Sequence, residues 1–270
     1  MNSDRLSSAL HGKRVLITGA SSGIGEALTR LLAGRGAHLI LAARREGALL
    51  ALQQELGTDS SPISVYPADL RDPAALAGLL AYLHELPGGL DIVVSNAGHS
   101  IRRPIRESLD RYHDFTRTMA LHYLAPVRLL LSVLPLLERN GGQVVSVSTV
   151  NVLLLPVPHW AAYQASKAAF DTWLRSAGPE LARIGVAATS LYFPLVRTPM
   201  ILPTEAYRRW PAMSSRQAAR LIGRCLYTRR RVWKPWWLFP GQLASVLLRW
   251  AWEAFAARKR KERGDRHEGH

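Results

Sequence analysis

Tyr163 and Lys167, four residues apart, are the pair in this sequence best suited to move a proton. If the stretch is helical, the two side chains lie on one face, about one turn apart. A nearby ammonium group favours the phenolate, which predicts that the pKa of Tyr163 lies well below that of a free tyrosine. Such a phenol can exchange a proton with a carbonyl or alcohol oxygen. An amphipathic helix with a chance Tyr and Lys shows the same pattern, so the rest of the chain has to decide.

The composition bounds the architecture and the compartment. The chain has 270 residues, 48% of them hydrophobic, enough for one large α/β domain or one domain plus an appendage. The net charge of +15 predicts a polyanionic neighbour: a membrane, a phosphorylated ligand or nucleic acid. A single cysteine, Cys225, excludes an internal disulfide and fits a reducing compartment. Residues 1–12 lack the apolar core of a signal peptide, and we expect no spanning stretch, so a cytoplasmic protein is expected.

A glycine-rich turn follows the first apolar run. Residues 14–18 are typical of a buried parallel strand, and residues 26–33 have a helical pattern. Between them the TGxxxGxG pattern lets backbone N–H groups approach a phosphate at a helix N-terminus. A plain turn between strand and helix is the alternative. The predicted cofactor-binding residues of this turn are Thr18, Gly19, Ser21, Ser22, Gly23, Ile24 and Gly25.

Two arginines follow the second predicted strand, residues 38–43. In such folds the end of this strand faces the adenosine ribose, where an acidic residue binds the free 2′-hydroxyl. This chain has Arg44 and Arg45 instead, which can pair with a 2′-phosphate. The sequence therefore favours NADP(H) over NAD(H). Two solvated arginines that open a helix are the alternative.

The next two predicted strands, residues 63–66 and 91–95, also end in polar residues. Asp69, beside Leu70, can accept a hydrogen bond from an adenine amino group, or cap the helix that starts near Pro73. Asn96, followed by Ala97 and Gly98, can hold two backbone segments together beside a cofactor, or serve as a simple turn residue.

Strands and helices alternate along the remaining chain. Helical patterns cover residues 109–138 and a segment from Tyr163 to about residue 184; strands cover 143–148 and 186–193. This alternation predicts a single doubly wound α/β (Rossmann) domain over residues 1–228, with a parallel sheet flanked by helices and right-handed crossovers.

With TGASSGIG, SNAG and YQASK in this order, the chain resembles the short-chain dehydrogenase/reductase family over about residues 11–200. The resemblance implies NAD(P)(H) at the carboxyl ends of the strands, no metal, and frequent dimers or tetramers. It implies that Tyr163 is the acid/base and that Lys167 holds the nicotinamide ribose and lowers the tyrosine pKa. A serine at the end of the fifth strand would bind the reacting oxygen, and an asparagine in the central helix would support a relay water. Thr198 matches the position that contacts the nicotinamide carboxamide.

Two positions depart from this family pattern. His122 stands where the family has Asn; a neutral imidazole can position a water, whereas a protonated one would repel Lys167. A helix histidine without a catalytic part is the alternative. The usual Ser-Ser pair is Ser148-Thr149, and the family spacing to the tyrosine falls on Val150. One inserted residue would restore Thr149 as the catalytic hydroxyl, and Ser148 is the other candidate.

The segment PLVRTPM, residues 194–200, together with its continuation to residue 207, resembles the bacterial branch that reduces long-chain fatty acyl-CoA to aldehyde. The resemblance implies a lipophilic substrate. A steroid or ketone/3-oxoacyl-type reductase is an alternative within the family. A catalytically silent NADP(H)-binding scaffold or sensor is the alternative of another class.

Residues 229–270 form a basic, tryptophan-rich extension. Eleven Lys/Arg and three acidic residues lie in 229–266. A stripe at helical spacing comprises Leu243, Val246, Leu247, Trp250 and Ala254. Together they predict an amphipathic helix on the cytoplasmic face of an anionic membrane. The alternative is a helix packed on its own domain or on a dimer partner. Nucleic acid is not favoured, because no binding module is readable.

Overall fold

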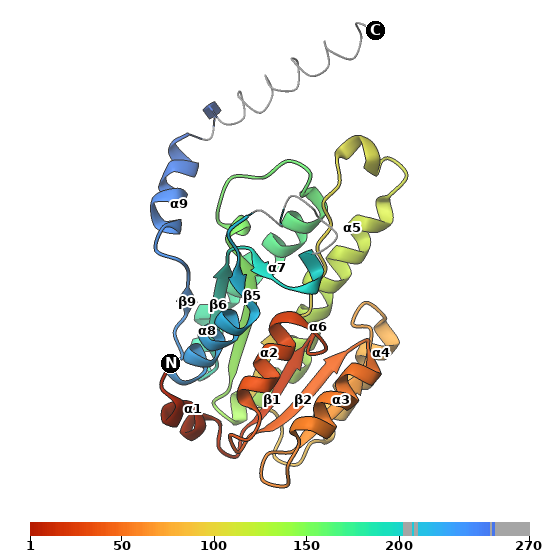
Figure 1. Cartoon of the computed structure of the whole chain (residues 1–270), viewed down its shortest axis with the longest axis vertical. Helices are drawn as coiled ribbons and strands as arrows, with labels where there is room; N and C mark the ends of the chain where they lie inside the picture. Colours follow the sequence, from red (N-terminus) through yellow and green to blue (C-terminus); the bar gives the residue numbers. More distant parts are fainter. Residues whose placement is uncertain (202–206, 208–209, 249, 252–270) are drawn as a thin grey trace, which may run out of the picture.

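A seven-stranded parallel sheet forms the centre of the molecule in the computed structural model, which describes residues 1–201, 207, 210–248 and 250–251 (Figure 1). The strand order is β3-β2-β1-β4-β5-β6-β9. The order reverses between β1 and β4, and this places a crevice at the carboxyl ends of the strands. The predicted doubly wound α/β domain is confirmed. The strands are β1 (Arg14–Thr18), β2 (His38–Ala43), β3 (Ile63–Pro67), β4 (Ile92–Ser95), β5 (Gln143–Thr149), β6 (Ala187–Phe193) and β9 (Val232–Trp233).

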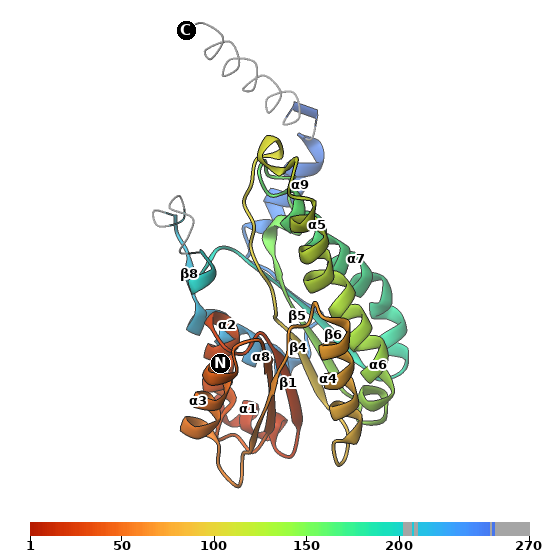
Figure 2. The ribbon, with the colours of Figure 1, turned by 90° about the vertical axis from the view of Figure 1, so that its right-hand side faces the viewer.

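Helices cover both faces of this sheet because alternate strand residues point to opposite sides and both sets are apolar (Figure 2). In β1, Val15 and Ile17 enter one core, whereas Leu16 enters the other. The first core also contains side chains of α1 (Ser3–Leu10), α2 (Gly23–Leu32), α3 (Glu46–Leu56) and α8 (Ser215–Thr228). The second also contains side chains of α4 (Pro73–Glu85), α6 (Ala125–Arg139) and α7 (Ala161–Arg183).

The single helix expected over residues 109–138 is wrong in detail. A 3-10 turn at Ile105–Ser108 precedes α5 (Tyr112–Met119), and a π-helical turn at Ala120–Leu124 joins α5 to α6. Pro126 has no N–H to give to the carbonyl of His122, four residues earlier, so the α-helical pattern cannot continue there. The N–H of Ala125 reaches back to the carbonyl of Ala120 instead. The π turn carries His122 into the protein interior, where it is 2% exposed.

The expectation that no stretch has the length and hydropathy of a membrane span also needs correction. Residues 112–139 contain such a window, with a mean hydropathy of 1.6. Leu129, Val133 and Leu137 of this stretch are buried in the second core beneath the sheet. We therefore interpret it as a core helix.

The chain after α8 returns to the sheet before it leaves the domain. The predicted boundary at residue 228 falls between α8 and β9. β9 pairs in parallel with β6, and the ring centroids of Trp233 and Phe193 lie 5.4 Å apart. α9 (Leu238–Leu247) follows beyond the carboxyl ends of β5 and β6 (Figure 1). A short second sheet joins β7 (Val196–Arg197) to β8 (Met213–Ser214).

The tight turn between β1 and α2 predicts that Gly25→Ala disrupts the domain locally. An added Cβ at Gly25 would lie 2.2 Å from the backbone oxygen of Gly19, and neither backbone can yield cheaply. We expect the variant to lose about 1–3 kcal/mol of unfolding free energy and its dinucleotide binding. Gly47→Ala, at a helical position with nothing within 4 Å, is the control and should be neutral or stabilising. Denaturation and NADPH titration test this; equal behaviour of the two variants would contradict it.

Candidate active site

The glycine-rich turn forms the first wall of the site. Gly19 and Gly23 have φ values of +68° and +60°, which favour glycine. Ser22, the N-cap residue of α2, makes no side-chain capping hydrogen bond, so the first N–H groups of the helix are not capped by it. These N–H groups and the close-packed turn fit a dinucleotide phosphate. An added Cβ at Gly23 would lie 2.9 Å from Cγ2 of Thr198, so the predicted nicotinamide contact lies beside this turn.

Thr18 and Asn96 join the ends of β1 and β4. The hydroxyl of Thr18 accepts from the N–H groups of Asn96 and Ala97 at 2.9 and 3.0 Å and donates to the carbonyl of Val94. The amide of Asn96 donates to the carbonyls of Thr18 and Gly19 at 3.0 and 3.3 Å. Asn96 thus holds two backbone segments together rather than serving as a simple turn residue. Its contact with a cofactor stays a prediction.

Three arginines, Arg44, Arg45 and Arg71, lie where β2 and β3 end. Arg45 donates to the carbonyl of Ser21 at 2.9 Å, which ties it to the glycine turn, whereas Arg44 is exposed. The guanidinium of Arg71 binds both carboxylate oxygens of Asp69 and lowers the pKa of that carboxyl. Arg71 is not among the predicted site residues, although a basic residue two positions after a strand-end aspartate can indicate such a pair.

Asp69 does not cap the helix that follows, so that alternative is wrong. Asp72 is the N-cap residue of α4, and its side chain accepts from the N–H of Ala74 at 2.9 Å. The predicted contact of Asp69 with adenine stays a prediction. Leu70 is buried beside it at the strand end.

Tyr163 lies in an aromatic surrounding that keeps its proton in place. The ring packs edge-on against Trp160 and His122, with centroids 5.5 and 5.6 Å away. Burial, and then the neighbouring Tyr207, raise the pKa of Tyr163 to about 12, while a hydrogen bond with Thr149 acts in the opposite direction. The expected pKa below that of free tyrosine is therefore wrong: loss of hydration outweighs the hydrogen bond with Thr149.

Lys167 is held one turn further along α7. Burial lowers the pKa of Lys167 to about 8, and its ammonium group donates to the carbonyl of Val147 at 3.3 Å. Gly98 lies beside this group, because an added Cβ there would be in ordinary contact with Nζ of Lys167, at 3.5 Å. The lysine is thus positioned between the ends of β4 and β5.

Thr149, rather than Ser148, is the hydroxyl that reaches the tyrosine. Thr149 ends β5 and forms the hydrogen bond with Tyr163, and its Oγ1 accepts from the N–H of Asn151 at 3.3 Å. Ser148 points into the interior, and its hydroxyl makes no hydrogen bond within the described part of the chain. Gln164 holds the intervening loop, donating to the carbonyl of Asn151 at 2.6 Å and accepting from the N–H of Val157 at 3.0 Å. The catalytic role of Thr149 stays a prediction.

His122 links the end of β4 to α7. Its Nε2 accepts from the N–H of His99 at 2.9 Å, so the ring proton sits on Nδ1, which donates to Oγ of Ser166 at 2.8 Å. Ser166 in turn donates to the carbonyl of Tyr163 at 2.8 Å. Burial, followed by the charge of Lys167, lowers the pKa of His122 well below its usual value. Both ring nitrogens are engaged, so neither is available to hold a relay water.

An aromatic wall that no sequence motif predicts lies beside Tyr163. Tyr207 lies 5.8 Å from both Trp160 and Trp210, measured between ring centroids, and Trp210 is more than half exposed. The residues around Tyr207, at 202–206 and 208–209, lie outside the described residues. The wall joins Trp160, at the start of α7, to Tyr207 and Trp210, and only the fold brings these two segments together.

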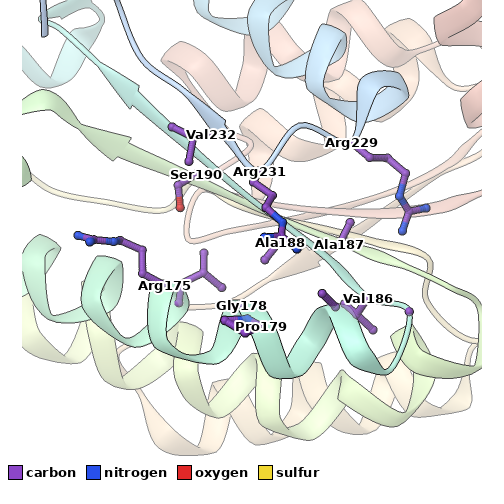
Figure 3. Close-up of a pocket in the computed structure, with 13 residues that line it drawn as sticks. Arg175, Gly178, Pro179, Val186, Ala187, Ala188, Ser190, Arg229, Arg231 and Val232 are labelled. Carbon is purple, nitrogen blue, oxygen red and sulfur yellow. The ribbon is translucent and has the colours of Figure 1, made fainter. Parts of the chain in front are cut away.

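A groove of about 480 Å³ lies elsewhere, at the open edge of the sheet between α7 and β6 (Figure 3). Its lining includes Arg175, Arg229 and Arg231, which point in different directions. Arg229 donates to the carbonyls of Gly141 and Gly142. The groove borders the amino-terminal half of β6 and is separate from the candidate site.

Comparison with known proteins decides the family. Residues 13–208 match the sequence profile described as short chain dehydrogenase. The chain belongs to the short-chain dehydrogenase family. A solved short-chain dehydrogenase from Sphingobium yanoikuyae in complex with NADPH is similar to this family member, with a TM-score of 0.75 and 26% identity. The match covers 94% of this chain and 95% of that one.

Two curated relatives within this family carry a specific activity in their names. A fatty acyl-CoA reductase of Acinetobacter baylyi is 42% identical over 212 residues, 78% of this chain and 72% of that protein. A fatty acyl-CoA reductase of Mycobacterium tuberculosis is 44% identical over 211 residues, with the same shares.

The buried His122 predicts a measurable pH dependence of stability. An unfolded histidine has a pKa of about 6.5, whereas that of His122 is lower in the folded chain, so the unfolded state binds more protons below about pH 6.5. The free energy of unfolding therefore falls as the pH drops through this range, by up to about 1.4 kcal/mol per pH unit from this group.

His122→Asn should remove this part of the acid sensitivity. Denaturant unfolding from pH 7 to pH 5 should give a shallower decline for His122→Asn than for the wild type. His84→Asn, at an exposed histidine, is the matched control and should retain the wild-type slope. Equal slopes for the wild type and His122→Asn would contradict the neutral, doubly bonded imidazole.

Proposed function

We propose that this short-chain oxidoreductase uses NADP(H) to reduce the carbonyl of a lipophilic substrate, with long-chain fatty acyl-CoA, converted to aldehyde, as the first candidate. The observation that carries the proposal is the partly buried, protonated Tyr163 with Thr149 and Lys167 at the carboxyl end of β5. The two relatives named as fatty acyl-CoA reductases support this choice of substrate.

The protein's own part in the reaction is to place and give a proton. When bound, the nicotinamide cofactor supplies the hydride for the carbonyl carbon. Tyr163, with a pKa of about 12, carries its proton at neutral pH and donates it to the carbonyl oxygen. Thr149 donates a hydrogen bond to the same oxygen. Lys167, with a pKa of about 8, is mostly charged at pH 7 and stabilises the phenolate that Tyr163 leaves behind.

With an acyl-CoA the proposed reaction has two steps. Addition of hydride to the thioester carbon and of a proton to its oxygen gives a hemithioacetal. The carbon–sulfur bond then breaks, the hydroxyl loses its proton, and the CoA sulfur leaves as a thiol. The aldehyde is the other product. Trp160, Tyr207 and Trp210 provide an apolar wall that suits an acyl chain.

A ketone is the second candidate substrate. A solved alcohol dehydrogenase from Comamonas testosteroni, described as specific for bulky-bulky ketones, has a TM-score of 0.71 and 25% identity to this chain. The same tyrosine and threonine would serve that reaction, and a steroid ketone would meet the same aromatic wall. A homodimer or homotetramer and a peripheral position on a membrane, through residues 229–270, complete the proposal.

Tyr163→Phe separates an enzyme from a silent cofactor-binding scaffold. The variant should bind NADPH with little change and lose NADPH oxidation by at least about a hundredfold, because the proton donor is gone. The measurement is a screen of NADPH consumption with palmitoyl-CoA, long-chain aldehydes and steroid ketones. The enzyme proposal fails if the wild type turns over none of these, or if Tyr163→Phe turns them over equally well.

The proposed preference for NADP(H) rests on Arg44. This residue lies next to Arg45, which is hydrogen-bonded to the glycine-rich turn. Arg44→Asp should weaken NADPH binding about ten- to a hundredfold, since it removes a charge-assisted bond to phosphate, and should change NADH binding little. Arg183→Asp, an equal charge change at an exposed position of α7, is the control. Titration of both dinucleotides measures this. An equal loss for NADPH and NADH in Arg44→Asp would refute the 2′-phosphate role.

A further inference from the structure

The outer face of α9 carries a continuous apolar stripe. Phe239, Leu243, Val246 and Leu247 lie on one side of α9 at helical spacing. Trp236 and Trp250 lie just before and just after the helix. Each of the six is between 59% and 84% exposed. We name these residues the outer α9 stripe: Trp236, Phe239, Leu243, Val246, Leu247 and Trp250.

The opposite side of α9 is attached to the active-site segment. Leu238 is fully buried and packs with Val150 and Tyr192. An added Cβ at Gly241 would lie 3.4 Å from Cδ2 of Leu154, so the helix backbone lies close to that side chain. Val150 follows Thr149 directly, and Leu154 lies in the loop that Gln164 holds. α9 is thus docked through its inner side onto the segment that leads from Thr149 to Tyr163.

The alternative of a helix packed on its own domain holds for the inner side of α9 but not for the outer α9 stripe. The described stripe residues do not pack on the protein's own domain, because they face away from it. Ala254, the remaining residue of the stripe defined from the sequence, lies outside the described residues. The outer face of α9 therefore has no partner within the described chain.

The charge of this region indicates what the partner is. Residues 229–252 contain five Lys/Arg and no acidic residue, and the whole chain has a net charge of +15. Two copies that met through this basic segment would repel each other there, whereas an anionic bilayer attracts the segment. Exposed tryptophans at both ends of an apolar stripe suit the headgroup region of a bilayer. Apolar area and positive charge are the two terms that bind a helix at such an interface.

We propose that the outer α9 stripe inserts into an anionic lipid surface and that the inner side of α9 holds the Thr149–Tyr163 segment at that surface. Acyl substrates then enter the site from the bilayer rather than from water. The entry step rests on the lipophilic substrate proposed above. The binding step does not, because it follows from the exposed stripe and the charge alone.

The binding step is tested with the full-length chain and vesicles. Vesicles of phosphatidylcholine, with and without phosphatidylglycerol, are sedimented with the wild type and with the triple variant Phe239→Ser/Val246→Ser/Leu247→Ser. We expect the wild type to sediment with the anionic vesicles and the triple variant to lose at least about tenfold in affinity. Leu50→Ser/Leu131→Ser, at exposed leucines of α3 and α6, is the matched control and should bind as the wild type does.

Two further readouts keep the result specific. The triple variant should keep the wild-type thermal transition and NADPH affinity, which shows that it is folded. Triple-variant binding equal to wild type, or no wild-type binding to anionic vesicles, would overturn the proposal. If the triple variant instead turns a wild-type oligomer into a monomer while wild type ignores vesicles, the stripe contacts a second copy and the lipid proposal is wrong.

The entry step has its own measurement. Adding anionic vesicles should raise the turnover of palmitoyl-CoA relative to that of butyryl-CoA in the wild type, and should leave this ratio unchanged in the triple variant. An unchanged ratio in the wild type would overturn entry from the bilayer. Stripe-dependent vesicle binding without any acyl-CoA turnover would overturn the proposed acyl-CoA substrate instead, so the two failures are distinguishable.

Discussion

The partial burial of Tyr163 and Lys167 is the constraint on which the rest of the site depends. Desolvation opposes charge on both groups, so it raises the tyrosine pKa to about 12 and lowers the lysine pKa to about 8. The tyrosine keeps its proton at neutral pH, while the lysine keeps most of its charge. Tyr163 is therefore protonated before the reaction, as a proton donor for carbonyl reduction must be. Hydrogen bonds with Thr149 and with the carbonyl of Val147 partly offset the cost of this burial.

These two groups stay in place because side chains tie together segments that are distant in sequence. His122 and Ser166 connect the backbone at His99 to the carbonyl of Tyr163. Gln164 holds the loop that follows Thr149 in the same way. Each tie uses both hydrogen-bonding ends of a polar side chain, so removing one leaves a buried backbone or side-chain group unpaired. The substituted histidine is thus better understood as a positioning residue than as a relay.

Much of the fold could be predicted from local sequence, for reasons that the structure makes visible. The strands are apolar runs because both faces are covered, and the TGxxxGxG glycines are required because a Cβ at Gly25 would strike a backbone oxygen. The N-cap role of Asp72 was also readable, since it immediately precedes Pro73. The raised pKa of Tyr163 could not be predicted from the sequence, because the fold is what brings Tyr207 and Trp160 against this side chain. The outward direction of the α9 stripe likewise depends on the docking of Leu238.

Transfer of label from the cofactor to an acyl carbon tests the central claim most directly. The protein is incubated with palmitoyl-CoA and NADPH that carries deuterium at the reactive carbon of its nicotinamide, and the products are analysed by mass spectrometry. The account predicts hexadecanal with one deuterium and an equal amount of free CoA thiol from the wild type, and neither product from Tyr163→Phe. Absence of labelled aldehyde from the wild type, or equal amounts from both proteins, would contradict it.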